Sequence, residues 1–134
     1  MKTTYCSILL VTAFLSLTSC KVDGGENIYS EVDFSACLPD DAQIAVLRID
    51  YTLAGSFLRN INTDYEYTLP AFINGSCHIK LRKGIYLLSF DGDATLADGT
   101  VRRVRFAGHS VNRDALPLTG DHETVLLNLA YLQQ

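Results

Sequence analysis

The sequence lacks the short motifs that mark the common catalytic and nucleotide-binding sites. It contains no P-loop, no dinucleotide-binding glycine fingerprint and no G-x-S-x-G nucleophile elbow. Its three histidines, His78, His109 and His122, are far apart, whereas zinc sites usually carry ligands at a paired spacing. We therefore expect no metal and no cofactor, and we expect that the protein is not an enzyme.

Positive charge is also scarce. Lysine and arginine total 11 against 15 aspartates and glutamates, which gives a formal net charge of −4. A surface that binds nucleic acid needs a basic footprint, so we expect no nucleic-acid partner. There is also no internal repeat. After the apolar run near the amino terminus, no later run is long enough to cross a membrane.

That single apolar run ends at a cysteine. Lys2 precedes it, and residues 7–17 carry no charge. The run is shorter than the roughly 20 apolar residues of a membrane-spanning helix, and small residues follow it, as in a secretory signal. Its last four residues, Leu17-Thr18-Ser19-Cys20, resemble the lipobox of bacterial lipoproteins. In that family the signal is cut before the cysteine, which carries the acyl chains.

This resemblance implies a signal peptide over residues 1–19, a lipid on Cys20 and a flexible tether through residue 27. Each buried methylene contributes about 0.8 kcal/mol, so several acyl chains hold a protein on a membrane permanently. Lys21 stands where many inner-membrane lipoproteins carry Asp, which favours the outer membrane of the cell envelope. The alternative is an ordinary secretory signal in which Cys20 is incidental.

The rest of the chain alternates in the manner of β-strands. Apolar residues recur with period 2 in several segments, separated by Gly, Pro, Asn and Asp. The strongest turn signals are Asn74-Gly75 and Asp98-Gly99, because glycine tolerates a positive φ. The pattern predicts one domain over residues 28–134, a single antiparallel β-sandwich of about six to seven strands. The expected strands cover residues 28–36, 43–53, 63–72, 79–82, 85–90, 103–107 and 124–132.

One hairpin carries a second resemblance. The segment Leu81-Arg82-Lys83-Gly84-Ile85-Tyr86-Leu87-Leu88 is similar to the L-x-x-G-x-Y-x-L hairpin of transthyretin-like and fimbrillin-like domains. The resemblance implies that Gly84 opens the turn and that Tyr86 packs inward. It also links the chain to small surface lipoproteins of Bacteroidota, some of which accompany fimbriae or glycan-uptake systems.

Two cysteines remain in the expected domain. Cys37 and Cys77 would occupy a compartment that permits disulfides, and a bridge would contribute about 4 kcal/mol on the chain-entropy model. The alternative is two free thiols that pack as small apolar residues. The sequence leaves both outcomes open.

Basic residues gather in two segments that we expect to be neighbouring strands. If these strands pair, they form a basic face for an anionic glycan or an acidic protein, although a solvated face is the simpler interpretation. Asp91, Asp93 and Asp98 carry oxygen ligands, but the EF-hand pattern fails, and ordinary turn aspartates are the default. The residues of the expected basic face are Lys80, Arg82, Arg103 and Arg105.

These observations favour a non-catalytic binding or assembly module, anchored to a membrane through its N-terminal lipid. The alternative is a periplasmic inhibitor or immunity lipoprotein that binds one specific enzyme. Both classes are small, stable and without an active site, so composition does not separate them.

Overall fold

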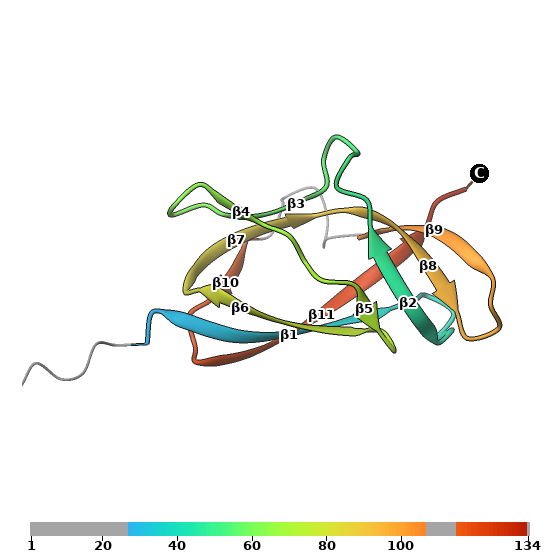
Figure 1. Ribbon diagram of the computed structural model, residues 1–134, viewed down its shortest axis with the longest axis horizontal. Coiled ribbons are helices and arrows are strands. Elements are labelled where there is room, and N and C mark those ends of the chain that lie inside the picture. Colours follow the sequence, from blue (N-terminus) through green and yellow to red (C-terminus); the bar gives the residue numbers. More distant parts are fainter. Residues whose placement is uncertain (1–26, 107–114, 134) are drawn as a thin grey trace, which may run out of the picture.

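The computed structural model describes residues 27–106 and 115–133, and within them every regular element is a strand. The all-β class expected from the sequence is therefore confirmed. Figure 1 shows the strands as an elongated body. The strands are β1 (Tyr29–Cys37), β2 (Ile44–Ile49), β3 (Phe57–Asn60), β4 (Tyr65–Tyr67), β5 (Phe72–Ile73), β6 (Ser76–Arg82), β7 (Gly84–Ser89), β8 (Asp91–Leu96), β9 (Val101–Phe106), β10 (Leu116–Leu118) and β11 (His122–Tyr131).

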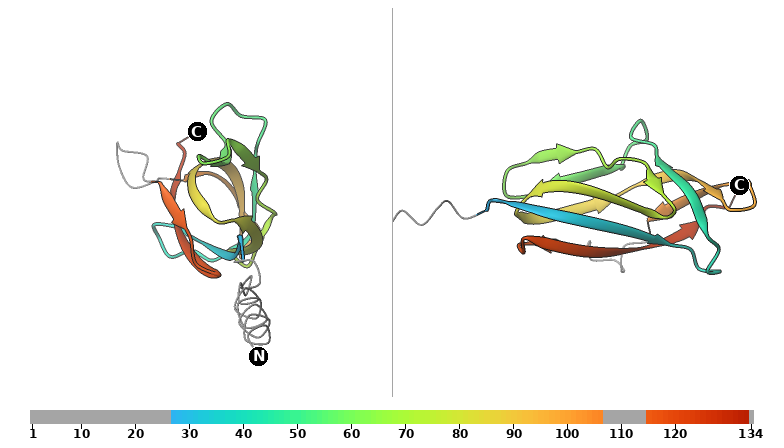
Figure 2. Two further views of the ribbon diagram at one scale, coloured as in Figure 1. Left: turned by 90° about the vertical axis from the view of Figure 1, so that its left-hand side faces the viewer. Right: turned by 60° about the horizontal axis from the view of Figure 1, so that its bottom comes forward.

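Seven of these strands form a closed barrel in the order β1-β11-β9-β8-β2-β5-β6. The other four form a smaller sheet in the order β10-β7-β3-β4. Seen from the end where β1 begins, the strands ring a central core (Figure 2, left). The expected count of six to seven strands is thus too low, and the described strands form a seven-stranded barrel and a smaller four-stranded sheet.

The pairing of the first and last strands closes the barrel. β1 runs parallel to β11, with Phe34 beside Val125, and antiparallel to β6 on its other side. The prediction of a purely antiparallel fold is wrong at this one pair. Local alternation identifies a strand but carries no information about a partner at the other end of the sequence, so the sequence pattern missed this contact.

Two strands of the small sheet continue almost directly into the barrel. β7 ends at Ser89 and β8 begins at Asp91, and the intervening Phe90 is buried. The sequence pattern predicted one strand that ends at Phe90. In the structure the chain passes from the small sheet into the barrel at this residue, as strands do at the corners of packed sheets. Both sheets therefore share one hydrophobic core.

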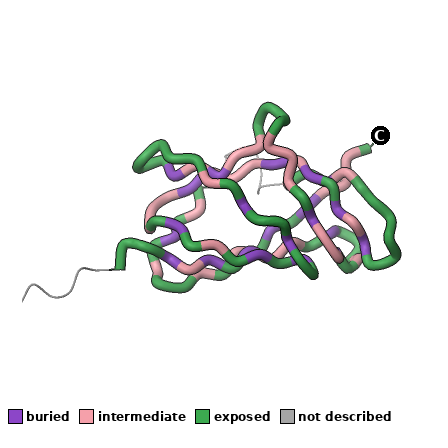
Figure 3. Tube along the Cα trace, viewed as in Figure 1, coloured by how far each residue is buried: buried purple, intermediate pink, exposed green. Residues whose placement is uncertain are grey.

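Side chains in this core come from strands of both sheets. Val32 and Phe34 of β1, Leu58 of β3 and Tyr86 of β7 are all fully buried in one contiguous cluster. Buried and exposed positions alternate along the strands in Figure 3, as the period of a strand requires. The predicted first strand, with Val32 and Phe34 inward, is confirmed.

The segment around Gly84 agrees with its resemblance in one respect and differs in another. Tyr86 has no exposed surface, and its hydroxyl donates a hydrogen bond to the carbonyl oxygen of Arg82, four residues earlier, so the inward tyrosine is confirmed. The expected hairpin is wrong, because β6 lies between β5 and β1 in the barrel whereas β7 lies between β10 and β3 in the small sheet. Within the small sheet, a Cβ at Gly84 would lie 2.7 Å from the side-chain nitrogen of Asn60 on the neighbouring strand β3.

Candidate functional site

The described chain enters β1 at one end of the barrel. Cys20 and most of the tether lie outside the described residues, and the first strand begins at Tyr29. β1 then runs the length of the barrel and finishes at Cys37, as the blue ribbon of Figure 1 shows. The barrel therefore has two distinct ends: one where residue 28 enters β1, and one where β1 stops.

The two cysteines lie on opposite faces of the same wall. Cys77 of β6 is buried opposite the inward-facing Phe34, whereas Cys37 is exposed three positions farther along β1. Successive side chains on a strand point to opposite faces, so the two sulfurs do not meet. Both are free thiols, but only Cys77 packs as a small apolar residue, because Cys37 is exposed. Burial raises the pKa of Cys77 to about 12, which keeps it protonated.

The four basic residues do not share a face. Lys80 and Arg82 lie on β6, and Arg103 and Arg105 lie on β9, but β1 and β11 separate these two strands in the barrel. The expectation of one basic face is therefore wrong, because the parallel pair β1–β11 lies between the two strands that carry the basic residues. We call the paired strands β8 and β9 the first wall and the paired strands β1 and β6 the second wall; each wall carries two of the four basic residues.

On the first wall, β8 and β9 carry an arginine–aspartate ladder. Arg105 lies directly opposite Asp91 and makes two contacts with its carboxylate, at 2.7 and 2.9 Å. Arg103 lies opposite Asp93, with Nη1 3.0 Å from Oδ1, and its Nη2 reaches Asp50 at 3.3 Å. The hydrogen bond from Arg105 lowers the pKa of Asp91 below its usual value. Opposite charges placed across a ladder stabilise the pairing.

The three aspartates considered above as oxygen ligands each have partners within the protein. The carboxylates of Asp91 and Asp93 face arginines, and that of Asp98 accepts hydrogen bonds from the backbone and hydroxyl of Thr100. Within residues 27–106 and 115–133, no group of three His, Cys, Asp or Glu side chains is placed to hold a metal ion. Asp98 is thus a turn former, as expected, whereas Asp91 and Asp93 lie on β8 and face arginines.

On the second wall, β1 and β6 carry a ladder built around a histidine. His78 lies opposite Asp33, with Nδ1 2.8 Å from Oδ1, and its Nε2 lies 2.9 Å from Oε2 of Glu31. Lys80 lies opposite Glu31 at 3.2 Å. Hydrogen bonds to Asp33 first, and then to Glu31, raise the pKa of His78. The hydrogen bond from Lys80 is the main cause that lowers the pKa of Glu31.

Sequence reasoning missed this second ladder. Its only signal is the i, i+2 spacing of Glu31 with Asp33 and of His78 with Lys80, which puts each pair on one face of its strand. The spacing becomes informative only when the register of β1 against β6 is known.

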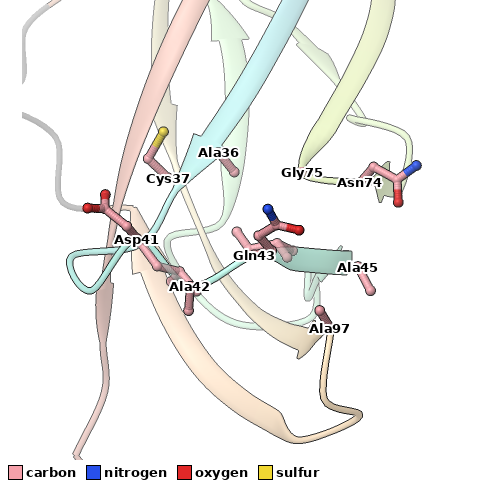
Figure 4. A pocket seen from close by; sticks show the side chains of 11 residues that line it. Ala36, Cys37, Asp41, Ala42, Gln43, Ala45, Asn74, Gly75 and Ala97 are labelled. Atoms are coloured by element: carbon pink, nitrogen blue, oxygen red, sulfur yellow. The ribbon is translucent and has the colours of Figure 1, made fainter.

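A concave feature lies at the end of the barrel where β1 stops. It is a pocket of about 480 Å³ between the end of β1, the start of β2 and the turns after β5 and β8. Figure 4 shows that small side chains line most of it and that Gln43 lies in its middle, with the Asp41 carboxylate and the Asn74 amide on opposite sides. The small lining residues are Ala36, Ala42, Ala45, Gly75 and Ala97.

The turn at Asn74-Gly75 shapes one side of this pocket. Both residues have positive φ, 51° and 75°, as a tight hairpin turn requires, so the predicted turn is confirmed. The carbonyl oxygen of Gly75 accepts the backbone N–H of Ala36 at 2.7 Å. The N–H of Asn74 donates to the carbonyl oxygen of Ala45 at 2.8 Å. The turn thereby holds the end of β1 and the start of β2 on either side of the pocket.

The tyrosines of β4 divide between surface and core. Tyr65 is 60% exposed, whereas Tyr67 is partly buried against the core and packs near Tyr86, with ring centroids 5.9 Å apart. They do not form a flat pair, because their own rings meet edge to face.

No protein-family model, no curated protein and no solved structure matches this chain. In the described ranges, no helix of the length and apolar character needed to cross a membrane is found.

Proposed function

We propose that this protein is a lipid-anchored, non-catalytic binding module of the cell envelope, held on the outer membrane through Cys20. The observation that carries the proposal is the position of the pocket. The lipobox and tether lead to the start of β1, and the pocket lies where β1 ends, at the other end of the barrel. A chain anchored at one end would therefore present the pocket away from the membrane.

The lining of the pocket favours a protein partner. Small side chains leave space for a protruding side chain or loop, while Gln43 and Asn74 offer amide donors and acceptors. An anionic glycan is less favoured than the sequence suggested, because Lys80, Arg103 and Arg105 each pair with a carboxylate and Asp41 adds negative charge at the pocket. The proposed ligand is an exposed loop of another envelope protein.

We also propose that the two sheets act as the layers of a distorted β-sandwich of the transthyretin- or fimbrillin-like kind. The shared core and the direct passage of β7 into β8 support this finer description. The inward Tyr86 agrees with it, since a hydroxyl bonded to upstream backbone is a recurrent feature of such sandwiches.

The anchor is tested first, with the full-length chain expressed in a bacterium that processes lipoproteins. Wild-type protein should incorporate radiolabelled palmitate and float with membranes in a density gradient, and Cys20→Ser should do neither. Protease treatment of intact cells then reports whether the domain lies outside the cell. If wild-type protein remained soluble and unlabelled, the proposed anchor would be rejected.

The pocket is tested by chemical crosslinking in intact cells. Ala97→Arg fills the pocket, and Val101→Arg is the matched control, because Val101 is 61% exposed in the same hairpin and does not line the pocket. We expect Ala97→Arg to reduce the yield of a specific crosslinked partner about tenfold, and Val101→Arg to leave it unchanged. Equal loss or equal retention in both variants would reject the pocket. A domain protected from protease and bound tightly to one periplasmic enzyme would instead support the inhibitor or immunity alternative.

A further inference from the structure

Exposed apolar side chains concentrate at the end of the barrel where the tether enters. Four of the eight large apolar side chains that are exposed in the described residues lie there. The backbone oxygen of Ile28 accepts a hydrogen bond from Lys83, and the N–H of Ile61 donates to the backbone oxygen of Ile85. Ile28 and Ile61 therefore lie on either side of the segment from Lys83 to Ile85. These four residues, which we call the tether-end patch, are Ile28, Tyr29, Ile61 and Tyr65, with 51%, 42%, 46% and 60% of their surface exposed.

Cations border this patch, and so do carboxylates. One of these, Asp64, lies between Ile61 and Tyr65 in the sequence, and its side chain is 87% exposed and 3.8 Å from Arg59. Arg82 is exposed directly opposite Tyr29, and the Lys80 ammonium lies 5.6 Å from the centre of the Tyr29 ring. Asp121 is bound by Lys83 at 2.6 Å, and Glu31 is held by Lys80. Partial neutralisation of these carboxylates weakens their repulsion of an anionic surface, and lysine and arginine are attracted to one.

The length of the chain ahead of β1 limits what this patch can contact. Only residues 21–28 separate Cys20 from Tyr29. Even fully extended, such a segment spans about 30 Å at most, because each residue adds no more than about 3.6 Å. A domain on so short a tether stays within that distance of its anchor, and the end that carries the patch is the end to which the tether is joined.

From this juxtaposition we infer that the tether-end patch rests on the surface of the bilayer that holds the acyl chains of Cys20. The inference depends on the proposed lipid anchor. Tyrosine suits such a contact because its ring is apolar and its hydroxyl stays hydrated at the headgroup level. Isoleucine side chains add buried apolar area, and Arg82, which is exposed, keeps its charge near the headgroups while its stem covers apolar surface. The contact fixes the orientation of the barrel and turns the pocket away from the membrane.

The test uses the acylated full-length protein in vesicles of phosphatidylethanolamine and phosphatidylglycerol, with single environment-sensitive NBD labels. Cys37→Ser removes the exposed thiol, and Cys77 is buried with its pKa raised to about 12, so neither competes for the label. Ile61→Cys places the label in the patch. Val101→Cys is the matched control, because Val101 is also exposed (61%) and lies beside the hairpin that lines the pocket.

We expect the label at Ile61 to emit at shorter wavelength and to lose at least half of its intensity when lipids with a quencher near the headgroup are included. The label at Val101 should keep its aqueous emission and be unaffected by the quencher. Protein that floats with the vesicles but gives equal, water-like signals at both sites would overturn the inference and leave the anchor intact. A blue shift at Ile61 that rises with protein density but resists the lipid quencher would also overturn it, since it would show contact between copies of the chain. Failure of the protein to float at all would reject the proposed anchor, a different result from either of these.

Discussion

The two charged ladders resemble each other in register but differ in chemistry. On β8–β9, arginines face aspartates, and Arg103 is 22% exposed and shared between two carboxylates. On β1–β6, a histidine and a lysine face Glu31 and Asp33, with His78 57% and Lys80 58% exposed. Guanidinium groups stay charged at every relevant pH, whereas a histidine changes charge near neutrality. The charges across β8–β9 therefore stay the same over the relevant pH range, whereas the charge of the β1–β6 ladder changes with pH.

Side chains that point into the core from the two walls should contribute far more to the free energy of unfolding than either ladder. Phe34 of β1 is fully buried, so we expect Phe34→Ala to lower the free energy of unfolding by about 3–5 kcal/mol. Val104→Ala, on the facing side of β9, should cost about 2 kcal/mol because fewer atoms are removed. Urea unfolding measures both. A loss below about 1 kcal/mol for Phe34→Ala would contradict the inward orientation of β1.

The arginine ladder should show the next largest effect. Arg103→Leu keeps an apolar stem but leaves Asp50 and Asp93 without their shared partner. We expect a loss of about 1 kcal/mol in the free energy of unfolding, at the upper end of values for surface pairs because Arg103 is largely shielded from solvent. The measurement is urea unfolding at low and high salt, and the cost should shrink as salt rises. An unchanged midpoint at low salt would show that the ladder contributes nothing.

The histidine ladder should differ in its dependence on pH. The raised pKa of His78 means that its stabilising contribution is full below the unfolded-state pKa near 6.5 and is lost as the pH rises through the higher folded-state pKa. Substitution His78→Gln should therefore lower the thermal midpoint more at pH 5.5 than at pH 8.5. Arg103→Leu is the control from the other wall, and its cost should be the same at both values. A pH-independent cost for His78→Gln would remove the difference between the walls.

The smallest effect is expected at the exposed end of the histidine ladder. Lys80 contacts Glu31 and the ring of Tyr29, but its side chain is 58% exposed and flexible. Exposed pairs of this kind often contribute nothing measurable, so Lys80→Ala should leave the unfolding midpoint unchanged within error at physiological salt. A loss as large as that of Arg103→Leu would mean that exposure does not separate the two ladders.

The elements of this fold were more predictable from sequence than their partners. Val32 and Phe34 alternate with polar residues, Asn74-Gly75 has the composition of a tight turn, and Tyr86 follows Gly84 at the spacing of a known hairpin. Each of these features is encoded within a few residues. The parallel pairing of β1 with β11 is not, because it joins segments from opposite ends of the chain, and an error there misplaced the whole basic face.

The candidate site was less predictable for the same reason. The pocket is formed by four segments, and its lining is mostly alanine and glycine, which carry no chemical signal in a sequence. The histidine ladder depends on the register between Asp33 and His78, which local spacing does not specify. Sites assembled across the barrel become visible only after the strand order is known.

The parallel β1–β11 pair has a consequence for how the protein is made. A chain exported from its amino terminus delivers β1 to the far side of the membrane first and β11 last. Until β11 arrives, β1 can pair only with β6, and the inner faces of both strands remain uncovered. Contacts between distant segments form slowly because their loop-closure entropy must be overcome first. On the proposed lipid anchor, β1 would thus lie close to the membrane with an open edge until the end of the chain arrives, the stage at which a chaperone for exported chains would have the most surface to bind.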